Sequence, residues 1–525
     1  MDVLIWLFRL FRGIFRLFGW GNGDPRRQGT HGTSRWAKRW EQWWHGALTG
    51  EGVLLGHGAF WRKLRFSTDG MVMVFAAMGA GKGLGIVIPS LLTYRGSMLV
   101  TDPKGENYAI TRRQRATFGK VRMLNPSDLM HSDRYNPMDM IRAGTDTEVD
   151  DAAALAALMV KPDSTEGHWD TKAQSILKAL LLHTLREPPA SRTLATVRRL
   201  SSGQKETLIA TLEDIANASP SLAAREIAAS SITSSIDSNG NFSPEFGSIL
   251  SNLQKATEPW SAGAAAGKLS SSSTFQLSDL TDSTVTLYLC VDEEFLDTYD
   301  RWLRVMVGCV LKTLTRAKAK RPERKVVLML DEVAVLGRLD TLEKQSGLLR
   351  AYCTPVLIWQ NLPQIIEIYG DKAKSFLSNA TARVFFGVND NDTAEYVASM
   401  LGHTTTLSSS SGVSKGAGQE TRSHQEGQAE SGYWLLDPAE VQRLPVKRLI
   451  VKLRGMPYPI LGRRLDYRYV WSWRGLWDNW KAGPPPGMNN EPTPPADTEQ
   501  VKPEFEMGVP RPSRGRSLSV AAPGA

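Results

Sequence analysis

Residues 71–83 read MVMVFAAMGAGKG, an apolar run that leads directly into a glycine-rich turn ending in a lysine. The run predicts a buried strand, and the apolar residues after the turn predict a helix. In a phosphate-binding loop, glycines let successive backbone N–H groups converge on phosphate oxygens, and the lysine contacts the β- and γ-phosphates. The residues expected to hold the phosphates of a cofactor are Met78, Gly79, Ala80, Gly81, Lys82 and Gly83.

Two positions depart from the usual GxxxxGK[ST] pattern of such a loop. Ala76 stands where the first glycine is expected, and Gly83 replaces the hydroxyl residue that would ligate Mg²⁺. The alternative interpretation is a glycine-rich turn followed by a surface lysine. The surrounding sequence has to decide between the two.

Further short apolar runs indicate the other strands of a parallel sheet. They lie at 97–102, 120–125, 284–291, 325–332, 354–360 and 382–388, and helical patterns separate them. Between about 145 and 275 the strand signals fade and helical periodicity takes over. The chain therefore predicts an α/β domain that is interrupted in sequence by an all-helical insertion.

Two of these strands end in polar residues suited to phosphate chemistry. KVVLMLDE ends in Asp331, assigned to the metal, and Glu332, assigned as general base, because a buried strand can present two carboxylates at its carboxyl end. TPVLIWQ ends in Gln360, whose amide can hydrogen-bond the γ-phosphate or the attacking water. A helix cap is the alternative for each of the two motifs.

Composition and charge narrow the class of protein. The chain has 525 residues, 42% of them apolar, and three cysteines with no CxxC pair, which favours a globular protein of a reducing compartment without structural zinc. The net charge of +9 is concentrated in residues 1–65 and 445–475, which carry +7 each. Two basic zones on an acidic body predict contact with lipid or nucleic acid.

The N-terminal segment predicts attachment to a membrane surface. Within residues 1–23, Arg9, Arg12 and Arg16 fall on one side of a helical wheel that is otherwise rich in Leu and Phe. This pattern suits a helix lying in the headgroup plane and not one that spans the bilayer. Docking on the protein's own body or on a partner is the alternative.

Six segments follow from these patterns. We expect a membrane-surface segment at 1–23, a β-rich lead-in at 24–70, the nucleotide-binding domain at 71–185 and 273–480, an all-α domain at 186–272, and a flexible proline-rich tail at 481–525. Residues 404–432 are poor in apolar side chains, which predicts a mobile loop. The interval 445–475 alternates like a hairpin with a charged face, although its aromatic residues would also suit single-stranded DNA.

Several motifs together resemble type IV secretion coupling proteins of the TraG/TraD kind. They are GKGLGIVIPSLLTY (81–94), TDPKGEN (101–107), YNPMD (135–139), LMLDEVAVLG (328–337) and VFFGVNDNDTAEYVASMLG (384–402). The resemblance covers about residues 30–475 and implies an α/β fold: a RecA-like P-loop NTPase domain with an inserted all-α domain. It also implies an ATPase that uses ATP and Mg²⁺ and forms a homo-hexamer.

The resemblance extends to partners, location and further site residues. It implies DNA bound to a relaxase, or protein effectors, as cargo, and type IV secretion channel components as partners at the cytoplasmic face of the bacterial inner membrane. Arg350 is similar in position to the family's arginine finger, with Arg338 and Arg383 as weaker candidates, and Asp102 is expected beside the nucleotide. Members of the family usually carry N-terminal transmembrane helices, and in their place this chain has the basic amphipathic segment, so peripheral attachment or a membrane-spanning partner is expected.

Two other functions stay open from the sequence. A nucleotide-binding platform that recruits substrates with little hydrolysis would explain the missing hydroxyl at Gly83. A cytosolic DNA translocase would use the same motor without the membrane.

Overall fold

The computed structural model describes residues 32–49, 51–67, 69–161, 167–236, 241–317, 322–339, 342, 349–414 and 423–480, with the backbone alone for 407–414 and 423–430. The expected membrane-surface segment and the expected tail lie outside these residues. No helix in the part of the chain so described has the length and apolar character needed to cross a membrane.

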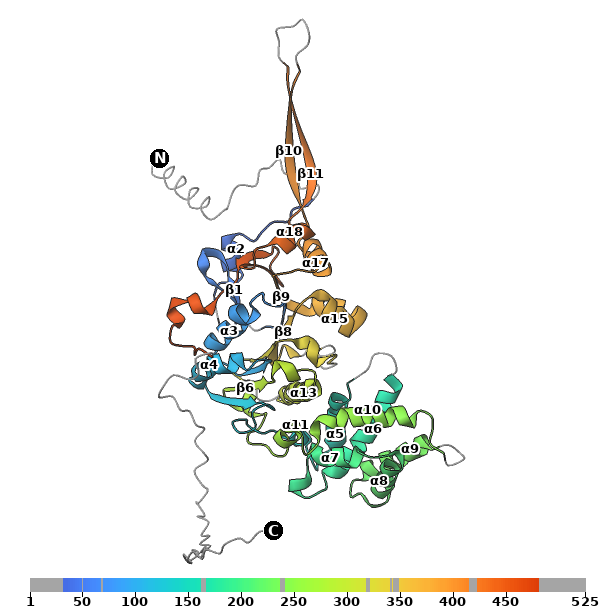
Figure 1. Cartoon of the computed structure of the whole chain (residues 1–525). Coiled ribbons are helices and arrows are strands. Elements are labelled where there is room, and N and C mark those ends of the chain that lie inside the picture. The colour runs from blue at the N-terminus through green and yellow to red at the C-terminus, as the bar shows by residue number, and fades with distance from the viewer. Residues whose placement is uncertain are drawn as a thin grey trace, which may run out of the picture. The chain divides into compact units, whose positions relative to one another are not determined.

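A large mixed sheet forms the centre of the α/β part (Figure 1). Its eleven strands among the described residues follow the order β2-β1-β13-β12-β9-β3-β8-β7-β4-β6-β5. Seven of them are parallel, namely β3 (Met71–Ala76), β4 (Met98–Asp102), β5 (Lys120–Leu124), β6 (Val285–Cys290), β7 (Val326–Leu330), β8 (Cys353–Trp359) and β9 (Ala380–Phe386). Each coincides with a predicted strand within a few residues.

The remaining strands extend the sheet in antiparallel fashion beyond β9. They are β12 (Arg448–Leu453), β13 (Ile460–Arg463), β1 (Val53–His57) and β2 (Lys63–Phe66). The hairpin interpretation of residues 445–475 is therefore confirmed for β12 and β13. The β-rich character of the lead-in is also confirmed, by β1 and β2.

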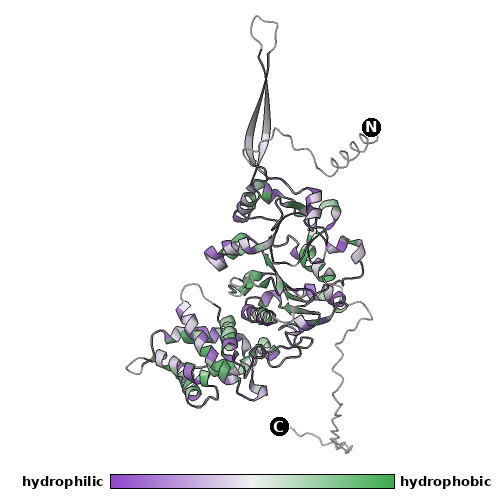
Figure 2. Cartoon of the chain, turned by 180° about the vertical axis from the view of Figure 1, so that it is seen from behind, coloured by the Kyte–Doolittle hydropathy of each residue, from purple (hydrophilic) through white to green (hydrophobic). Residues whose placement is uncertain are grey.

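The central strands are buried along their whole length, as strands covered on both faces must be. Every residue of β3, β6, β7 and β8 is buried, which explains why they appear in the sequence as continuous apolar runs. Figure 2 shows hydrophobic residues along these strands and hydrophilic residues mixed into the helices. The covering elements include η2 (Gly83–Val87), α3 (Ile88–Thr93), α4 (Glu106–Ala116), α13 (Asp300–Arg316), α15 (Leu362–Tyr369), α16 (Ala373–Asn379), α17 (Asn391–Leu401) and α18 (Pro438–Arg443).

The helical insertion begins earlier than the predicted boundary at residue 186. Its helices are α5 (Glu148–Met159), α6 (Gly167–Thr184), α7 (Leu194–Ser201), α8 (Lys205–Ala218), α9 (Leu222–Ser235), α10 (Phe246–Thr257), α11 (Ala265–Leu269) and α12 (Asp279–Asp282). Helix α6 packs against α9 and α10, so it belongs to the helical unit. The boundary was misplaced because a long apolar helix can pack on a sheet or on other helices, and sequence alone does not distinguish the two. The fading of strand signals near 145 was the better indicator.

The predicted mobile loop at 404–432 is wrong for residues 404–414 and 423–432, and its residues 415–422 lie outside the described residues. Strands β10 (His403–Ser414) and β11 (Ser423–Trp434) form a separate antiparallel pair, in register from His403 opposite Trp434 to Ser414 opposite Ser423. An antiparallel ladder satisfies backbone N–H and C=O groups without requiring buried apolar side chains. Apolar content, on which the prediction rested, therefore carried no signal here.

Candidate nucleotide-binding site

The glycine-rich loop connects β3 to η2, a short stretch of π-helix that continues into α3. Gly79 and Gly81 have φ of 74° and 87°, in the left-handed region that favours glycine. At Gly83, by contrast, an added Cβ would meet no atom within 4 Å, so local packing does not demand glycine there. The loop conformation thus explains the first two glycines and leaves the third open to a side chain.

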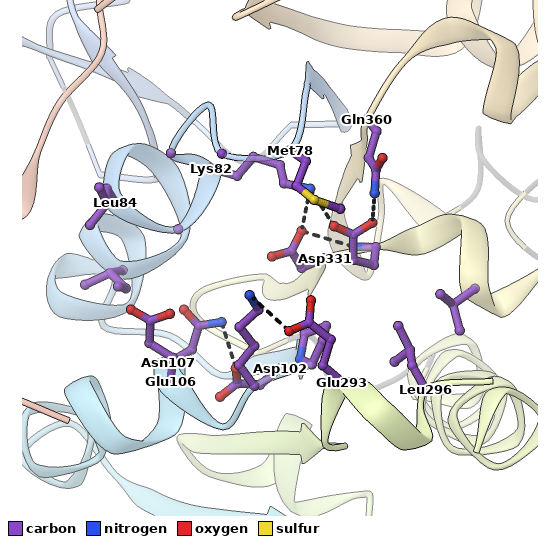
Figure 3. Close-up of a pocket in the computed structure, with 18 of the residues that line it drawn as sticks. Met78, Lys82, Leu84, Asp102, Glu106, Asn107, Glu293, Leu296, Asp331 and Gln360 are labelled. Carbon is purple, nitrogen blue, oxygen red and sulfur yellow. Dashed lines mark hydrogen bonds and ion pairs between the residues drawn. The ribbon is translucent and has the colours of Figure 1, made fainter. Parts of the chain in front are cut away.

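Lys82 points from this loop to the carboxyl end of β7 (Figure 3). Its Nζ lies 2.7 Å from Glu332 Oε1 and 3.7 Å from Asp331 Oδ1. The acidic pair comes 250 positions after Lys82 in the chain. The expectation that the lysine and the two carboxylates share one site is confirmed.

Glu332 occupies a strained position that several groups hold in place. Its φ and ψ are 50° and 47°, in the left-handed region, which is costly for a residue with a side chain. Its backbone N–H donates to Asp331 Oδ1 over 3.0 Å, and Gln360 Nε2 donates to Glu332 Oε2 over 2.9 Å. Gln360 from the end of β8 therefore orients the carboxylate that was predicted to be the general base.

Asp102, at the carboxyl end of β4, is a second buried carboxylate of the site. It accepts hydrogen bonds from the Tyr108 backbone N–H over 2.8 Å and from Asn107 Nδ2 over 3.2 Å. Burial raises the pKa of Asp102 to about 6 in spite of these donors, and the charge of Asp331 adds to the shift. Burial also raises the pKa of Asp331, against the lowering effect of the Lys82 ammonium. The site therefore concentrates negative charge where a cation would be stabilised.

A cleft of about 690 Å³ joins these groups, a size that suits a small organic ligand. The predicted residues that line it are Met78, Gly79, Gly81, Lys82, Gly83, Asp102, Asp331, Glu332 and Gln360. Leu84 and Glu106 lie at the end of the cleft opposite Gln360 (Figure 3). The parallel strands β3, β4, β7 and β8 deliver their carboxyl ends to this one edge of the sheet, where ligands of open α/β sheets bind.

Four predicted residues are not among those that line the cleft: Ala80, Arg350 and the two weaker candidates Arg338 and Arg383. Ala80 is buried, and its carbonyl accepts a hydrogen bond from the Arg464 guanidinium. Arg350 is exposed and lies outside the cleft. A residue that reaches a neighbouring subunit has to be exposed in the single chain, so this position does not contradict the predicted arginine finger.

The sequence did not predict the contribution of residues 464–480, named here the C-terminal segment. Arg468 and Trp480 line the cleft, and two hydrogen bonds to Asp466 fix the Arg468 guanidinium. The segment also packs on α3, which follows the glycine-rich loop, and on β1. Leu465, Tyr467 and Trp473 form one cluster with Ile88 and Leu92 of α3 and Leu54 of β1. The basic and aromatic character of this stretch was visible in the sequence, but it was interpreted as a charged hairpin face or a DNA contact.

Other cleft residues come from neighbouring turns. Glu293 Oε2 lies 3.3 Å from Lys104 Nζ, and Gln364 Oε1 accepts the backbone N–H of Gln360 over 3.0 Å.

The hydrogen-bond donors and the carboxylates of the cleft fit a triphosphate with its metal. Lys82 is an ammonium already placed among carboxylates, Asp331 is a carboxylate at a strand end, and Gly79 and Gly83 leave open space around the loop.

The comparisons with known proteins agree on one family. The model described as type IV secretory system conjugative DNA transfer matches residues 26–472. The conjugal transfer protein TraG of Escherichia coli is 28% identical over 469 residues, which covers 81% of this chain and 72% of TraG. Protein VirD4 of Agrobacterium fabrum is 29% identical over 461 residues, which covers 83% of this chain and 66% of VirD4.

Solved structures show the same fold. The bacterial conjugative coupling protein TrwB in its unbound monoclinic form superposes with a TM-score of 0.63 at 15% identity, over 85% of this chain and 95% of TrwB. TrwB in complex with ADP and Mg²⁺ gives 0.60 at 16% identity, over 82% and 93%. The predicted fold class, a RecA-like α/β domain with a helical insertion, is confirmed.

Proposed function

Since this chain belongs to the type IV secretory system conjugative DNA transfer family, we propose that it is an ATP-driven coupling protein. In this role it recruits DNA bound to a relaxase, or protein effectors, to a type IV secretion channel. The observation that supports the motor most directly is the ion pair of 2.7 Å between Lys82 and Glu332 across the cleft. It places a phosphate-loop lysine and a strand-end acid at the same cleft, and nucleotide hydrolysis needs both groups there.

The chain's own residues divide the chemistry. Bound ATP with Mg²⁺ supplies the phosphoryl bond whose hydrolysis releases energy. Backbone N–H groups of the loop and the Lys82 ammonium would bind phosphate oxygens, and Asp331 would hold the metal. When Lys82 pairs with phosphate, Glu332 loses its ammonium partner but keeps Gln360, so Oε1 becomes available to accept a proton from water.

Arg350 is the residue that acts between subunits in this proposal. It is exposed, and in a ring of six chains its guanidinium would reach the phosphates bound by a neighbour and neutralise developing charge. Hydrolysis would then depend on assembly. The ring would lie at the cytoplasmic face of the inner membrane, attached peripherally through residues 1–23.

Turnover in Mg²⁺ with saturating DNA tests the motor. We expect Lys82→Ala to lose nucleotide binding, and Glu332→Gln to keep binding while hydrolysis falls by about 10²–10⁴-fold. Matched controls are the exposed Lys374→Ala and Glu395→Gln, which should leave the rate unchanged. An undiminished rate in both site variants would refute the assignment of the site.

A recruitment platform with little hydrolysis is the second candidate, and Gly83 favours it because no hydroxyl is present to ligate Mg²⁺. Gly83→Ser separates the two candidates, since a Cβ there meets open space and the serine would restore the hydroxyl that such loops use to ligate Mg²⁺. A motor already turns over in the wild-type chain. A platform shows turnover only when the serine is present, or not at all.

A further inference from the structure

Four large aromatic side chains are exposed together on two adjoining elements outside the cleft. Trp43 and Trp44, exposed by 59% and 73%, end α2 (Arg39–Trp44), while Phe60 and Trp61, exposed by 62% and 66%, lie in η1 (Ala59–Trp61). Helix α2 contacts η1, and Gln42 Oε1 accepts the backbone N–H of Ala59 over 2.8 Å. Single exposed aromatics are ordinary, but a group of four in contacting elements marks an interaction surface.

The backbone at this surface is strained in a way that keeps two of the rings in solvent. Phe60 and Trp61 have φ of 56° and 57°, and Glu332 of the candidate site is the third described non-glycine residue with positive φ. Such a residue is strained and persists where the surrounding structure enforces the conformation, most often at functional sites. The turn between β1 and β2 thus holds two aromatic rings outward at a cost to folding.

Arginines accompany the rings. The Arg39 guanidinium lies 4.9 Å from the Phe60 ring centroid, and the Arg463 guanidinium lies 4.3 Å from that of Trp61. Arg62 is exposed in the same turn. The acid of α2, Glu41, is buried and paired with Arg35, so it does not offset these charges at the surface. We name the group of Arg39, Trp43, Trp44, Phe60, Trp61, Arg62 and Arg463 the aromatic–arginine patch.

We propose that the aromatic–arginine patch docks on an anionic lipid bilayer. Indole rings favour the interface between headgroups and acyl chains, and arginines are attracted to anionic headgroups. The same chemistry recurs in the sequence before α2, where Arg9, Arg12 and Arg16 interrupt a Leu- and Phe-rich stretch. This inference rests on the proposed membrane location and assigns part of that attachment to the folded body (Figure 1, α2 and β1).

The geometry of the rings favours lipid over single-stranded nucleic acid. Stacking of bases requires free ring faces. Here one face of Phe60 and one face of Trp61 are occupied by guanidinium groups, and His57 approaches Trp61 edge-on with centroids 6.1 Å apart. Phe60 and Trp61 therefore present apolar rings paired with cations, as a headgroup layer accommodates, and a base could stack on only one face of each.

Flotation of the full chain with vesicles tests this proposal. The vesicles are phosphatidylcholine with phosphatidylglycerol, compared with phosphatidylcholine alone. The variant Phe60→Asn with Trp61→Asn removes both rings, and asparagine tolerates positive φ, so the fold is retained. We expect its partition coefficient on the anionic vesicles to fall at least about tenfold. Arg39→Gln with Arg62→Gln should lower it by about fivefold per arginine on anionic vesicles only.

The control replaces two exposed apolar residues elsewhere, Met130→Asn with Leu222→Asn, and should float as wild type does. ATP binding serves as the check of folding in every variant. Wild-type flotation that the Phe60 and Trp61 variant retains in full would overturn the proposal. The proposal would also be overturned if this variant lost binding to a single-stranded oligonucleotide, or lost self-association, while its flotation stayed unchanged. If the wild-type chain binds ATP but does not float, membrane binding is refuted, while the proposed ATPase function is unaffected.

Discussion

Lys82 Nζ lies between two carboxylates, 2.7 Å from Glu332 Oε1 and 3.7 Å from Asp331 Oδ1. The three side chains are largely withdrawn from water, and among the described residues only the lysine carries compensating charge within salt-bridge distance. The phosphate loop and the acid-bearing strand end are therefore held together by the same groups that would act on a nucleotide. Replacing Lys82, Asp331 or Glu332 is therefore expected to change both the stability of the fold and the chemistry of the site.

The first prediction concerns this link. Lys82→Ala should lower the free energy of unfolding by about 1–3 kcal/mol, because two poorly hydrated carboxylates lose their cation. Urea denaturation measures the change. The exposed Lys374→Ala, whose partner Asp371 lies 3.9 Å away, should change stability by less than about 0.5 kcal/mol. Adding Glu332→Gln to Lys82→Ala should recover part of the loss, and an equal loss in the single and double variants would contradict this account.

The second prediction concerns the backbone of Glu332. Glycine has no steric penalty at a φ of 50°, so Glu332→Gly should be more stable than Glu332→Gln by about 1 kcal/mol, although both lack the carboxylate. The comparison of the two variants isolates the backbone from the side-chain charge. Denaturant midpoints provide the measurement. A glycine variant less stable than the glutamine variant would show that the left-handed conformation is not strained.

The third prediction concerns pH. The pKa of Asp102 is raised to about 6 from an unfolded value near 3.8, so the folded chain binds more protons between these values than the unfolded chain does. Stability from this group is fully present below about pH 4 and is lost as the pH rises through about 6. Asp102→Asn should therefore give a flatter stability profile than wild type in that window. Parallel slopes in the two profiles would exclude the effect.

The fourth prediction concerns Arg464. Its guanidinium donates to the Ala80 carbonyl, and an added Cβ at Gly81 or Gly85 would collide with its side chain, so it restrains the phosphate loop from outside. Arg464→Ala should weaken ATP binding by about fivefold, as expected for one lost hydrogen bond. Titration with a fluorescent ATP analogue measures this. Arg474→Ala, at an exposed arginine of the same segment, is the control. Equal affinities of the two variants for ATP would show that Arg464 does not restrain the phosphate loop.

The fifth prediction concerns action between subunits. Arg350→Ala should bind ATP normally, because the residue lies outside the cleft, but should hydrolyse it about 10³-fold more slowly. Mixed with Lys82→Ala chains, it should recover measurable turnover, since the latter supply Arg350 to sites that retain Lys82. Absence of recovery in mixed assemblies would indicate that Arg350 does not act on a neighbour.

Much of the fold was predictable because its signals are local. A strand buried on both faces has to be apolar throughout, so β3, β6, β7 and β8 stood out as short apolar runs. The loop at 77–82 was predictable because only glycine adopts the φ of Gly79 and Gly81 without strain. Asp331 and Glu332 followed from their place at the end of such a run.

Other features depend on which segments, distant in sequence, come into contact. The identity of a single residue does not reveal these contacts. The pairing of β10 with β11 rests on backbone hydrogen bonds among polar residues, so it was taken for a loop. Arg468 and Trp480 line the cleft only because the C-terminal segment packs on the helices after the phosphate loop. Their types are equally compatible with a charged surface.

The sequence by itself determined the parallel strands, the phosphate loop and the acids at the strand ends, because steric and burial requirements act on neighbouring residues. Only the tertiary structure decided that Lys82 reaches Glu332, that Gln360 orients that carboxylate, and that Arg464 restrains the loop. These contacts join residues 250, 28 and 384 positions apart, and such contacts form only when the sheet has placed its strands side by side.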